Sequence, residues 1–248
     1  LNIDYSFQFN NRQEYDIRRG ENAGRASLDM DLQTQNISVY GMADAFENTI
    51  YEAGIDYMTQ VNRPDAATEV RRLIPDYNAN KVGAFTSVTH NPSENLVLDA
   101  GLRYDRYHIN ATKFYLQSRW EDLGYDEQFA SFEIGREGNQ IKTQPEFQYD
   151  LFAFTAGAKY EFNTDYALSI NLSSANRAPN PSELFSDGLH HALATTALGR
   201  LDLTKAQSYK TITAFHAIKV CLDVEINPYL NFVSDFIQLV PTGLETLI

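Results

Sequence analysis

Apolar and polar residues alternate along much of this sequence, and this period of two limits the fold more than any other feature. In the stretch "LVLDAGLRYDRYH", Leu98, Leu102 and Tyr104 fall on one side, whereas Asp99 and Asp105 fall on the other. Successive side chains of a β-strand point to opposite faces, so the pattern predicts strands with one apolar and one polar face. No helical period of comparable length occurs in the sequence. We therefore expect an all-β protein.

The alternating segments are numerous and long. They lie near 1–15, 27–40, 48–61, 78–91, 95–109, 146–162, 165–177, 207–219 and 222–239. Strands of soluble proteins average roughly 5–6 residues. The longer segments fit a membrane-spanning strand of about 9–11 residues with additional length beyond the bilayer.

The connections between these segments alternate in length. "GMADAFE", "NPSE", "NTD" and a tight link near Lys219 are short, whereas 16–26, 62–77, 110–145 and 178–206 are long. Short turns at one end and long loops at the other are typical of an up-and-down outer-membrane barrel. A soluble sandwich has no reason to separate its loops in this way, and long loops without structure are unusual in it. The sequence predicts antiparallel strands in one curved sheet, with the long loops on one rim.

Composition agrees with a barrel and argues against other classes of protein. Thirty-three acidic and 20 basic residues give a net charge of -13, which argues against nucleic acid as a partner. No stretch has the roughly 18 consecutive apolar residues of a transmembrane helix. The first residues, "LNIDYSFQFNN", lack the basic start and apolar core of a signal peptide. The mean hydropathy of -0.39 fits a barrel wall, in which half of each strand and all loops are polar.

One stretch of the sequence is specific enough to suggest a family. "NRAPNPSELFSDGLHHA", followed by "LGRLDLTKAQSYKT", resembles the mid-barrel signature of TonB-dependent outer-membrane receptors. The residues that match are Arg177, Pro179, Glu183, Leu184, Phe185, Gly188, His190, Gly199 and Ser208. Leu201 and Ala206 depart from the Pro and Glu that are usual there. "NNRQEYDIRRG", "RRLIPDYNANKVGAF" and "AGLRYDRY" also resemble barrel segments of this family.

The resemblance implies a fold, a location and a role. It implies that residues 1–248 are part of a barrel of about 22 strands that encloses a plug domain. The plug and about 13 further strands would lie outside this chain. It also implies an active-transport receptor in the outer membrane of a Gram-negative bacterium, in contact with membrane lipid. Such a receptor captures a metal or metal chelate, for example a ferric siderophore, haem, cobalamin or zinc. The TonB complex, acting through the plug, then drives import, and no resident cofactor is required.

The loop after residue 177 contains a possible metal site. Glu183, Asp187, His190 and His191 are close in sequence, and imidazole and carboxylate groups suit Zn²⁺ and related ions. We expect this loop to fold inward over the lumen, because its polar residues have no place in lipid. The alternative is that Pro179 and Pro181 shape the loop and that the histidines only pack within it.

Other residues in the long loops are candidate contacts for a chelate. Arg71 and Arg72, together with Arg177, could hold an anionic ligand through their forked donors. Trp120 lies in the longest loop and could stack on a flat ligand. The alternative for the arginines is that they are solvated or pair with neighbouring acids.

Two other functional classes share some of these features. A passive porin would have the strands without the 176–208 signature or a plug. A soluble β-rich binding or adhesion module would pack its apolar strand faces against each other and remain in solution without detergent. An enzyme is not expected, because the sequence has no Gly-x-Ser-x-Gly, phosphate-loop, His-Glu-x-x-His or paired-cysteine motif.

Overall fold

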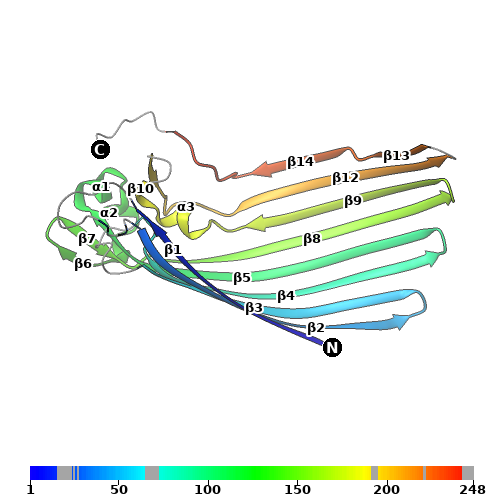
Figure 1. The fold of residues 1–248 in the computed structure, drawn as a ribbon, viewed down its shortest axis with the longest axis horizontal. Helices are drawn as coiled ribbons and strands as arrows, with labels where there is room; N and C mark the ends of the chain where they lie inside the picture. Colours follow the sequence, from blue (N-terminus) through cyan, green and yellow to red (C-terminus); the bar gives the residue numbers. More distant parts are fainter. Residues whose placement is uncertain are drawn as a thin grey trace.

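Nine long strands form one antiparallel meander in the computed structural model (Figure 1). The structure describes residues 1–15, 24, 26, 28–64, 73–190, 195–219 and 222–241. The strands of the wall are β1 (Asn2–Glu14), β2 (Leu28–Phe46), β3 (Thr49–Pro64), β4 (Asp76–Ser93), β5 (Leu96–Leu116), β8 (Glu146–Asn163), β9 (Tyr166–Arg177), β12 (Ala206–Lys219) and the pair β13 (Leu222–Ile226) and β14 (Tyr229–Ser234). Each pairs with its neighbour in sequence order along this path, which confirms the predicted single curved sheet.

The two ends of the sheet are built differently. Two-residue turns connect β2 to β3, β4 to β5 and β8 to β9 at one end, on the right of Figure 1. The first of these turns contains Asn48 at φ 58°, a conformation that Asn tolerates better than most residues. The described parts of the long connections all lie at the opposite end. The predicted segregation of loop length is confirmed for these parts.

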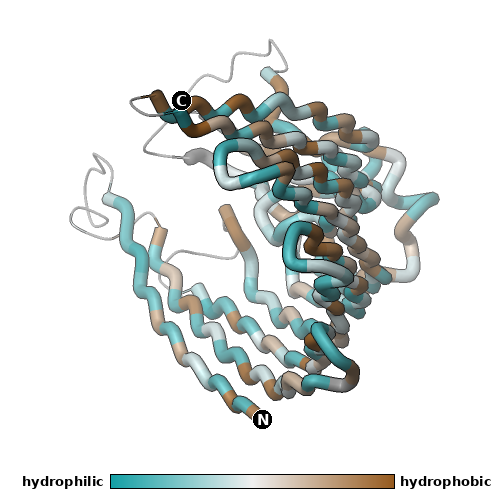
Figure 2. Tube along the Cα trace, turned by 90° about the vertical axis from the view of Figure 1, so that its right-hand side faces the viewer, coloured by the Kyte–Doolittle hydropathy of each residue, from teal (hydrophilic) through white to brown (hydrophobic). Residues whose placement is uncertain are grey.

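The alternation in sequence becomes two faces of the curved wall, and Figure 2 shows the arc of this wall from the end with the short turns. Ile55, Ala84, Tyr104 and Phe152 are register partners from strand to strand and form a row on one face. Ile55 is 62% exposed and Phe152 58% exposed, as expected for side chains that face lipid. Among the described residues this apolar face does not pack on a second sheet, so the alternative of a soluble module with its apolar strand faces packed together is not supported.

The opposite face is polar and contains packed charges. Arg103 lies between two carboxylates: its Nη2 is 2.7 Å from Asp56 Oδ1, and its Nε donates to Asp105 Oδ2 at 2.7 Å. Gly83 lies on the strand between Asp56 and Asp105, and a Cβ there would collide with this ion network. Since membrane barrels face lipid with their apolar side, the polar face lines the lumen.

Aromatic side chains mark two levels on the lipid-facing side. At the outer level, Tyr57 donates a hydroxyl hydrogen bond to Asn80 at 2.9 Å and Tyr104 donates one to Asp150 at 2.6 Å. At the inner level, Tyr160 packs edge-on against Phe162. Phe152 and Tyr160 are eight residues apart on β8. Eight residues of a tilted strand cross about 20 Å of membrane, close to the apolar band of about 25 Å in such barrels.

The last strand is shorter than predicted and is interrupted. The sequence predicts one strand over 222–239, but Asn227 and Pro228 separate β13 from β14, and β14 ends at Ser234. Both pieces keep the same register with β12, and Thr213 donates its N–H to the Pro228 carbonyl at 3.0 Å. Pro228 has no N–H to return a bond. Asp235, at φ 51°, turns the chain away from the sheet.

The long connections contain structure of their own, which we call the cap: the described residues of 117–145 and 178–205. Its elements are α1 (Gln117–Asp122), α2 (Tyr125–Gln128), a 3₁₀ turn η3 (Ala130–Phe132), β6 (Glu133–Glu137), β7 (Gln140–Thr143), α3 (Pro181–Phe185), β10 (Asp187–His190) and β11 (Thr195–Leu198). β5 extends to Leu116, beyond the predicted end at 109, because β7 pairs with its last four residues. None of the helices in the described part of the chain is long and apolar enough to cross a membrane.

Candidate functional site

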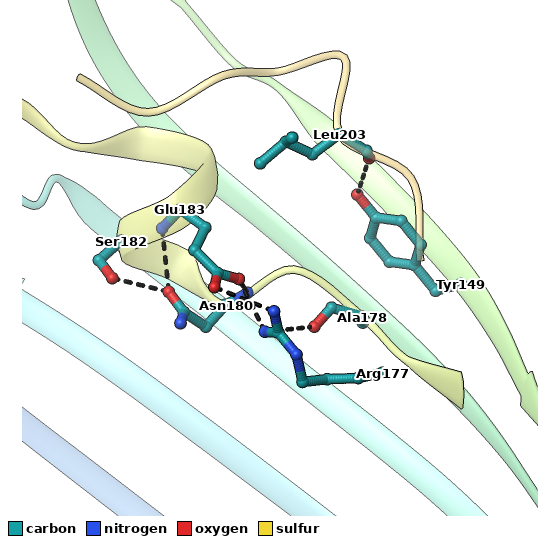
Figure 3. A network of polar contacts seen from close by, with 7 residues as sticks. All are labelled: Tyr149, Arg177, Ala178, Asn180, Ser182, Glu183 and Leu203. Atoms are coloured by element: carbon teal, nitrogen blue, oxygen red, sulfur yellow. Dashed lines mark hydrogen bonds and ion pairs between the residues drawn. The ribbon is translucent and has the colours of Figure 1, made fainter. Parts of the chain in front are cut away.

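A network of polar contacts lies at the start of α3 in the cap (Figure 3). Pro181 opens the helix, where its missing N–H costs nothing. The Asn180 side chain accepts from the Glu183 N–H at 2.9 Å, and the Glu183 carboxylate accepts from the Asn180 N–H at 2.8 Å. This reciprocal pair is a capping box. The sequence "NPSE" thus fixes where the chain turns after β9.

Arg177 holds the same carboxylate from the other side. Its two terminal nitrogens donate to Glu183 at 2.8 and 3.1 Å, so the pair is bidentate. Arg177 and Glu183 were expected to contact an anionic ligand and a metal, respectively. In this structure they bind each other, so any ligand would have to displace that pair.

Asp187 and the residues after α3 bring the loop across the sheet. The Asp187 N–H donates to the Leu73 carbonyl at 3.1 Å, which ties the loop after β9 to the segment before β4. The Arg200 N–H donates to the Glu183 carbonyl at 2.9 Å as the chain returns. A Cβ at Gly199 would lie 2.6 Å from the Leu184 carbonyl carbon, so this close passage requires glycine. Together with the contacts to lumen-facing strand residues described below, these bonds support the expected inward fold.

Lys113 fastens the two halves of the cap to each other. Its side chain projects from β5, is 3% exposed, and donates from Nζ to the Phe185 carbonyl at 2.7 Å. The ammonium also lies 4.2 Å from the centre of the Tyr115 ring. A buried ammonium requires such partners, because desolvation is costly. Residues 113 and 185 are therefore held in one rigid unit.

An aromatic core fills the cap. Trp120, Tyr125 and Tyr115 pack within 5.0–6.1 Å of one another, measured between ring centres. Phe185 and Leu184 of α3 belong to the same cluster, as does Tyr77, which projects from β4. Trp120 is 0% exposed, so the expectation that it stacks on a flat ligand is not supported in this conformation. Its position in the longest loop did not reveal that this loop is folded.

Two tyrosines of the core have perturbed hydroxyl groups. Burial raises the pKa of Tyr115 well above its ordinary value. Burial also raises the pKa of Tyr125, while the Leu201 N–H, donating to its hydroxyl oxygen at 3.0 Å, lowers it. Both tyrosines therefore stay neutral at ordinary pH. Within the described residues, neither the Tyr115 hydroxyl nor the Trp120 indole N–H has a hydrogen-bond partner.

A cleft of about 300 Å³ separates α3 from the lumen-facing side of β1 to β4. Asn10, Leu32, Asn62 and Tyr77 are register partners across four strands and form its floor. Asn180, Pro181 and Ser182 of α3 form the facing wall. Residues from opposite ends of the chain thus meet at the outer mouth of the lumen. The sequence did not indicate this cleft, since its floor residues belong to separate strands.

The structure tests only part of the expected metal set. Glu183 is engaged in the capping box, Asp187 is buried, and His190 is the last residue of β10, opposite Thr195. His191 lies outside the described residues. Across the part of the chain that the structure describes, no group of three or more His, Cys, Asp or Glu side chains is arranged to hold a metal ion. The four-residue metal site stays a prediction.

Two of the other expected ligand contacts are also untested, and some residues that organise the cap were not expected. Arg71 and Arg72 lie outside the described residues, so their contact with an anionic chelate also stays a prediction. Lys113 and Tyr125 were not singled out in the sequence, and Gly199 was named only as a match to the family signature, although all three hold the cap together. Gly199 lies within the family-like motif, which was the one available signal.

Comparison with known proteins identifies structures that share this fold. A search of curated protein sequences finds no match to this chain. Among solved structures, the copper transporter OprC aligns with a TM-score of 0.63 at 16% identity, over 94% of this chain and 36% of that protein. The ferric yersiniabactin uptake receptor FyuA from Yersinia pestis aligns with a TM-score of 0.54 at 11% identity, over 94% and 33%.

A third structure agrees with these two. The hemophore receptor HasR of Serratia marcescens, solved with its hemophore HasA and heme, aligns with a TM-score of 0.51 at 14% identity, over 84% of this chain and 34% of that one. This chain thus spans about a third of the length of each of these proteins. At these identities the likeness concerns the fold alone. The family model described as "TonB dependent receptor-like, beta-barrel" matches residues 1–244. The chain belongs to the TonB-dependent receptor-like β-barrel family.

Proposed function

We propose that this chain is the wall and capture mouth of an outer-membrane receptor that imports a scarce metal or metal chelate. The observation that carries the proposal is the membership of residues 1–244 in the receptor barrel family. Receptors of this family are transporters rather than enzymes. Proteins of similar fold are named for copper, heme and a ferric chelate, and on this likeness we propose iron chelates, haem and metal ions as the first cargoes to test.

The arrangement of the mouth supports capture from one side of the membrane. The cap lies at one rim, has its own core, and reaches across the lumen-facing side of the wall. A preformed mouth binds ligand with a smaller loss of conformational entropy than a flexible loop does. The cleft between α3 and β1 to β4 opens beside this cap and is a candidate first contact for cargo.

The acidic character of the chain supports a cationic cargo. With a net charge of -13, its field favours cations, and Glu183, Asp187, His190 and His191 are the donors that we propose for a metal. Arg71, Arg72 and Arg177 are the groups that we propose for an anionic chelate. We further propose that import uses energy from the TonB complex, transmitted by a plug domain within the lumen.

The test uses the full-length receptor in a Gram-negative host that lacks its own uptake systems. Uptake of radiolabelled zinc and of iron chelates is measured with and without a working TonB complex. Uptake that requires TonB supports active transport, whereas equal uptake in its absence supports a passive porin.

The metal donors are tested in the same protein by replacing His190 and His191 with Ala together. A control variant is His216→Ala, since His216 projects from β12 at the opposite end of the wall and pairs with Asp223 at 2.7 Å. Weaker zinc or chelate binding only in the double variant supports the proposed donors. Unchanged binding would show that these histidines are structural and that the cargo binds elsewhere.

A further inference from the structure

The outward face of the wall does not stay apolar over the whole length of its strands. Arg106 and His108 on β5 have the same register parity as Leu102 and Tyr104, so they leave the wall on its lipid-facing side. They lie beyond the level at which Tyr104 donates its hydroxyl to Asp150. Two residues of a strand span about 7 Å, which places Arg106 at the height of lipid headgroups.

Two cations converge on Asp150 at this height. Arg106 is the register partner of Asp150, and its Nε is 3.8 Å from Oδ1. Lys205 approaches from the chain entering β12 and donates from Nζ to the Asp150 carbonyl at 2.7 Å. The same ammonium lies 5.9 Å from the ring centre of Phe152, the adjacent lipid-facing aromatic residue. Arg106, Lys205 and Asp150 together carry one positive charge, and the next carboxylate on this face, Glu146, pairs with His108 at 2.8 Å.

Side-chain amides lie on the same outward face as these cations. Gln148, on the same face of β8, accepts from Arg106 Nε at 3.0 Å in the amide orientation that satisfies both groups. On the neighbouring strands, Asn176 donates to Gln207, and Gln207 in turn donates to Ser174. The Arg106 side chain remains 57% exposed despite these contacts. A guanidinium, an ammonium and several amides therefore face outward together.

We propose that this patch (Arg106, Gln148, Asp150, Asn176, Lys205 and Gln207) binds the phosphorylated sugar headgroup of an outer-leaflet glycolipid. Arg106 and Lys205 bind the phosphate, for which guanidinium and ammonium groups are suited. The amides hydrogen-bond sugar hydroxyls, and the acyl chains lie along Phe152 and Tyr104 below. The proposal requires only that the wall spans a membrane and is independent of which cargo the receptor carries.

The experiment uses the full-length receptor in detergent, with diphosphorylated lipid A as the probe and native mass spectrometry as the readout. Arg106→Ala combined with Lys205→Ala should reduce bound lipid A at least about tenfold, since two charge-assisted contacts are lost. Arg106→Lys combined with Lys205→Arg should retain most of the binding. Arg136→Ala combined with Lys142→Ala is the matched control, because these two cations lie on β6 and β7 and do not belong to the patch.

Additional measurements separate the possible outcomes. Removing the phosphates from lipid A should weaken its binding to the unmodified receptor as much as the Arg106/Lys205 double alanine substitution weakens binding of diphosphorylated lipid A. Millimolar inorganic phosphate should not displace the bound lipid. Folding of each variant is checked by its heat-dependent mobility on gels. Equal lipid binding by the alanine variant and the control overturns the proposal. So does a change of oligomeric state in the alanine variant without loss of lipid, which would make the patch a contact between receptor copies.

Discussion

Lys113 Nζ lies 2.7 Å from the carbonyl oxygen of Phe185, although the two residues are 72 positions apart in the sequence. This hydrogen bond joins the end of β5 to the end of α3 and is shielded from solvent. It makes the cap one body instead of two independent loops. The geometry of the outer mouth therefore depends on a buried contact between a strand of the wall and the loop after β9.

Replacing Lys113 with Met should loosen the loop after α3. The Phe185 carbonyl would lose its donor while remaining buried, at a cost of about 1–3 kcal/mol. Hydrogen exchange of the amides of 183–187 should accelerate accordingly, relative to amides in the middle of β8. Lys142→Met, also in the cap, should leave these amides unchanged. Equal exchange in both variants would show that the cap is held by its aromatic core alone.

Gly199→Ala should displace the returning chain from α3. The new Cβ would lie within 2.7 Å of the Leu184 carbonyl carbon and oxygen and of the Phe185 nitrogen, and this backbone cannot move aside easily. Overpacking of this kind costs about 1–3 kcal/mol. The measurement is protection of the Arg200 amide, which donates to the Glu183 carbonyl. Gly135→Ala is the control, because a Cβ there meets nothing within 4 Å.

Leu102→Lys should destabilise the barrel more than Ser87→Lys does, because the two residues lie on opposite faces of the wall. Leu102 is on the lipid-facing side, two residues below the outer aromatic level, so a lysine there costs between the about 0–1 kcal/mol of the interface and the about 2–4 kcal/mol of the midplane. Ser87 faces the lumen, and Glu52 is its register partner, so a lysine there would gain a cross-strand carboxylate. Unfolding from lipid vesicles in denaturant measures both. Equal destabilisation by the two lysines would contradict the assignment of faces.

Acid should weaken the attachment of the chain at residues 200–202. The bond from Arg200 lowers the pKa of Asp202 below its ordinary 3.8, so the pair adds stability above that pH. This contribution is lost as the pH falls through the lowered pKa. The effect is small, because Arg200 is largely exposed. Protection of the Leu201 amide, corrected for intrinsic exchange, should fall at acid pH, and Asp202→Asn should remove that dependence.

The wall could be predicted from the sequence because its information is local. Each residue of a spanning strand is assigned to lipid or lumen by its parity, so Leu102 and Arg103 can be placed without knowledge of any distant residue. The short connections were also evident, although β2 continues through most of "GMADAFE" and leaves only residues 47 and 48 for the turn. The end of the last strand was missed because positive φ at Asp235 is not encoded in hydrophobic alternation.

The cap could not be predicted in the same way. Its core joins Tyr77 of β4, Trp120 of α1 and Phe185 of α3, which lie far apart in the sequence and share no period. Glu183 appeared to be a ligand because its residue type suits metals, but its position three residues after Asn180 is equally that of a capping box. Composition identifies which residues can bind, whereas pairing within the fold decides which remain available.

The strict register of β5 has a consequence for how this protein can change over evolutionary time. Substitution at one position alters one face only, so lumen and lipid surfaces can drift separately. Insertion of a single residue near Ala100 would instead exchange the two faces for the rest of the strand, placing Arg103 and Asp105 in hydrocarbon. We therefore expect length variation among relatives to gather in the connections at the capped rim, while the strands vary by replacement alone.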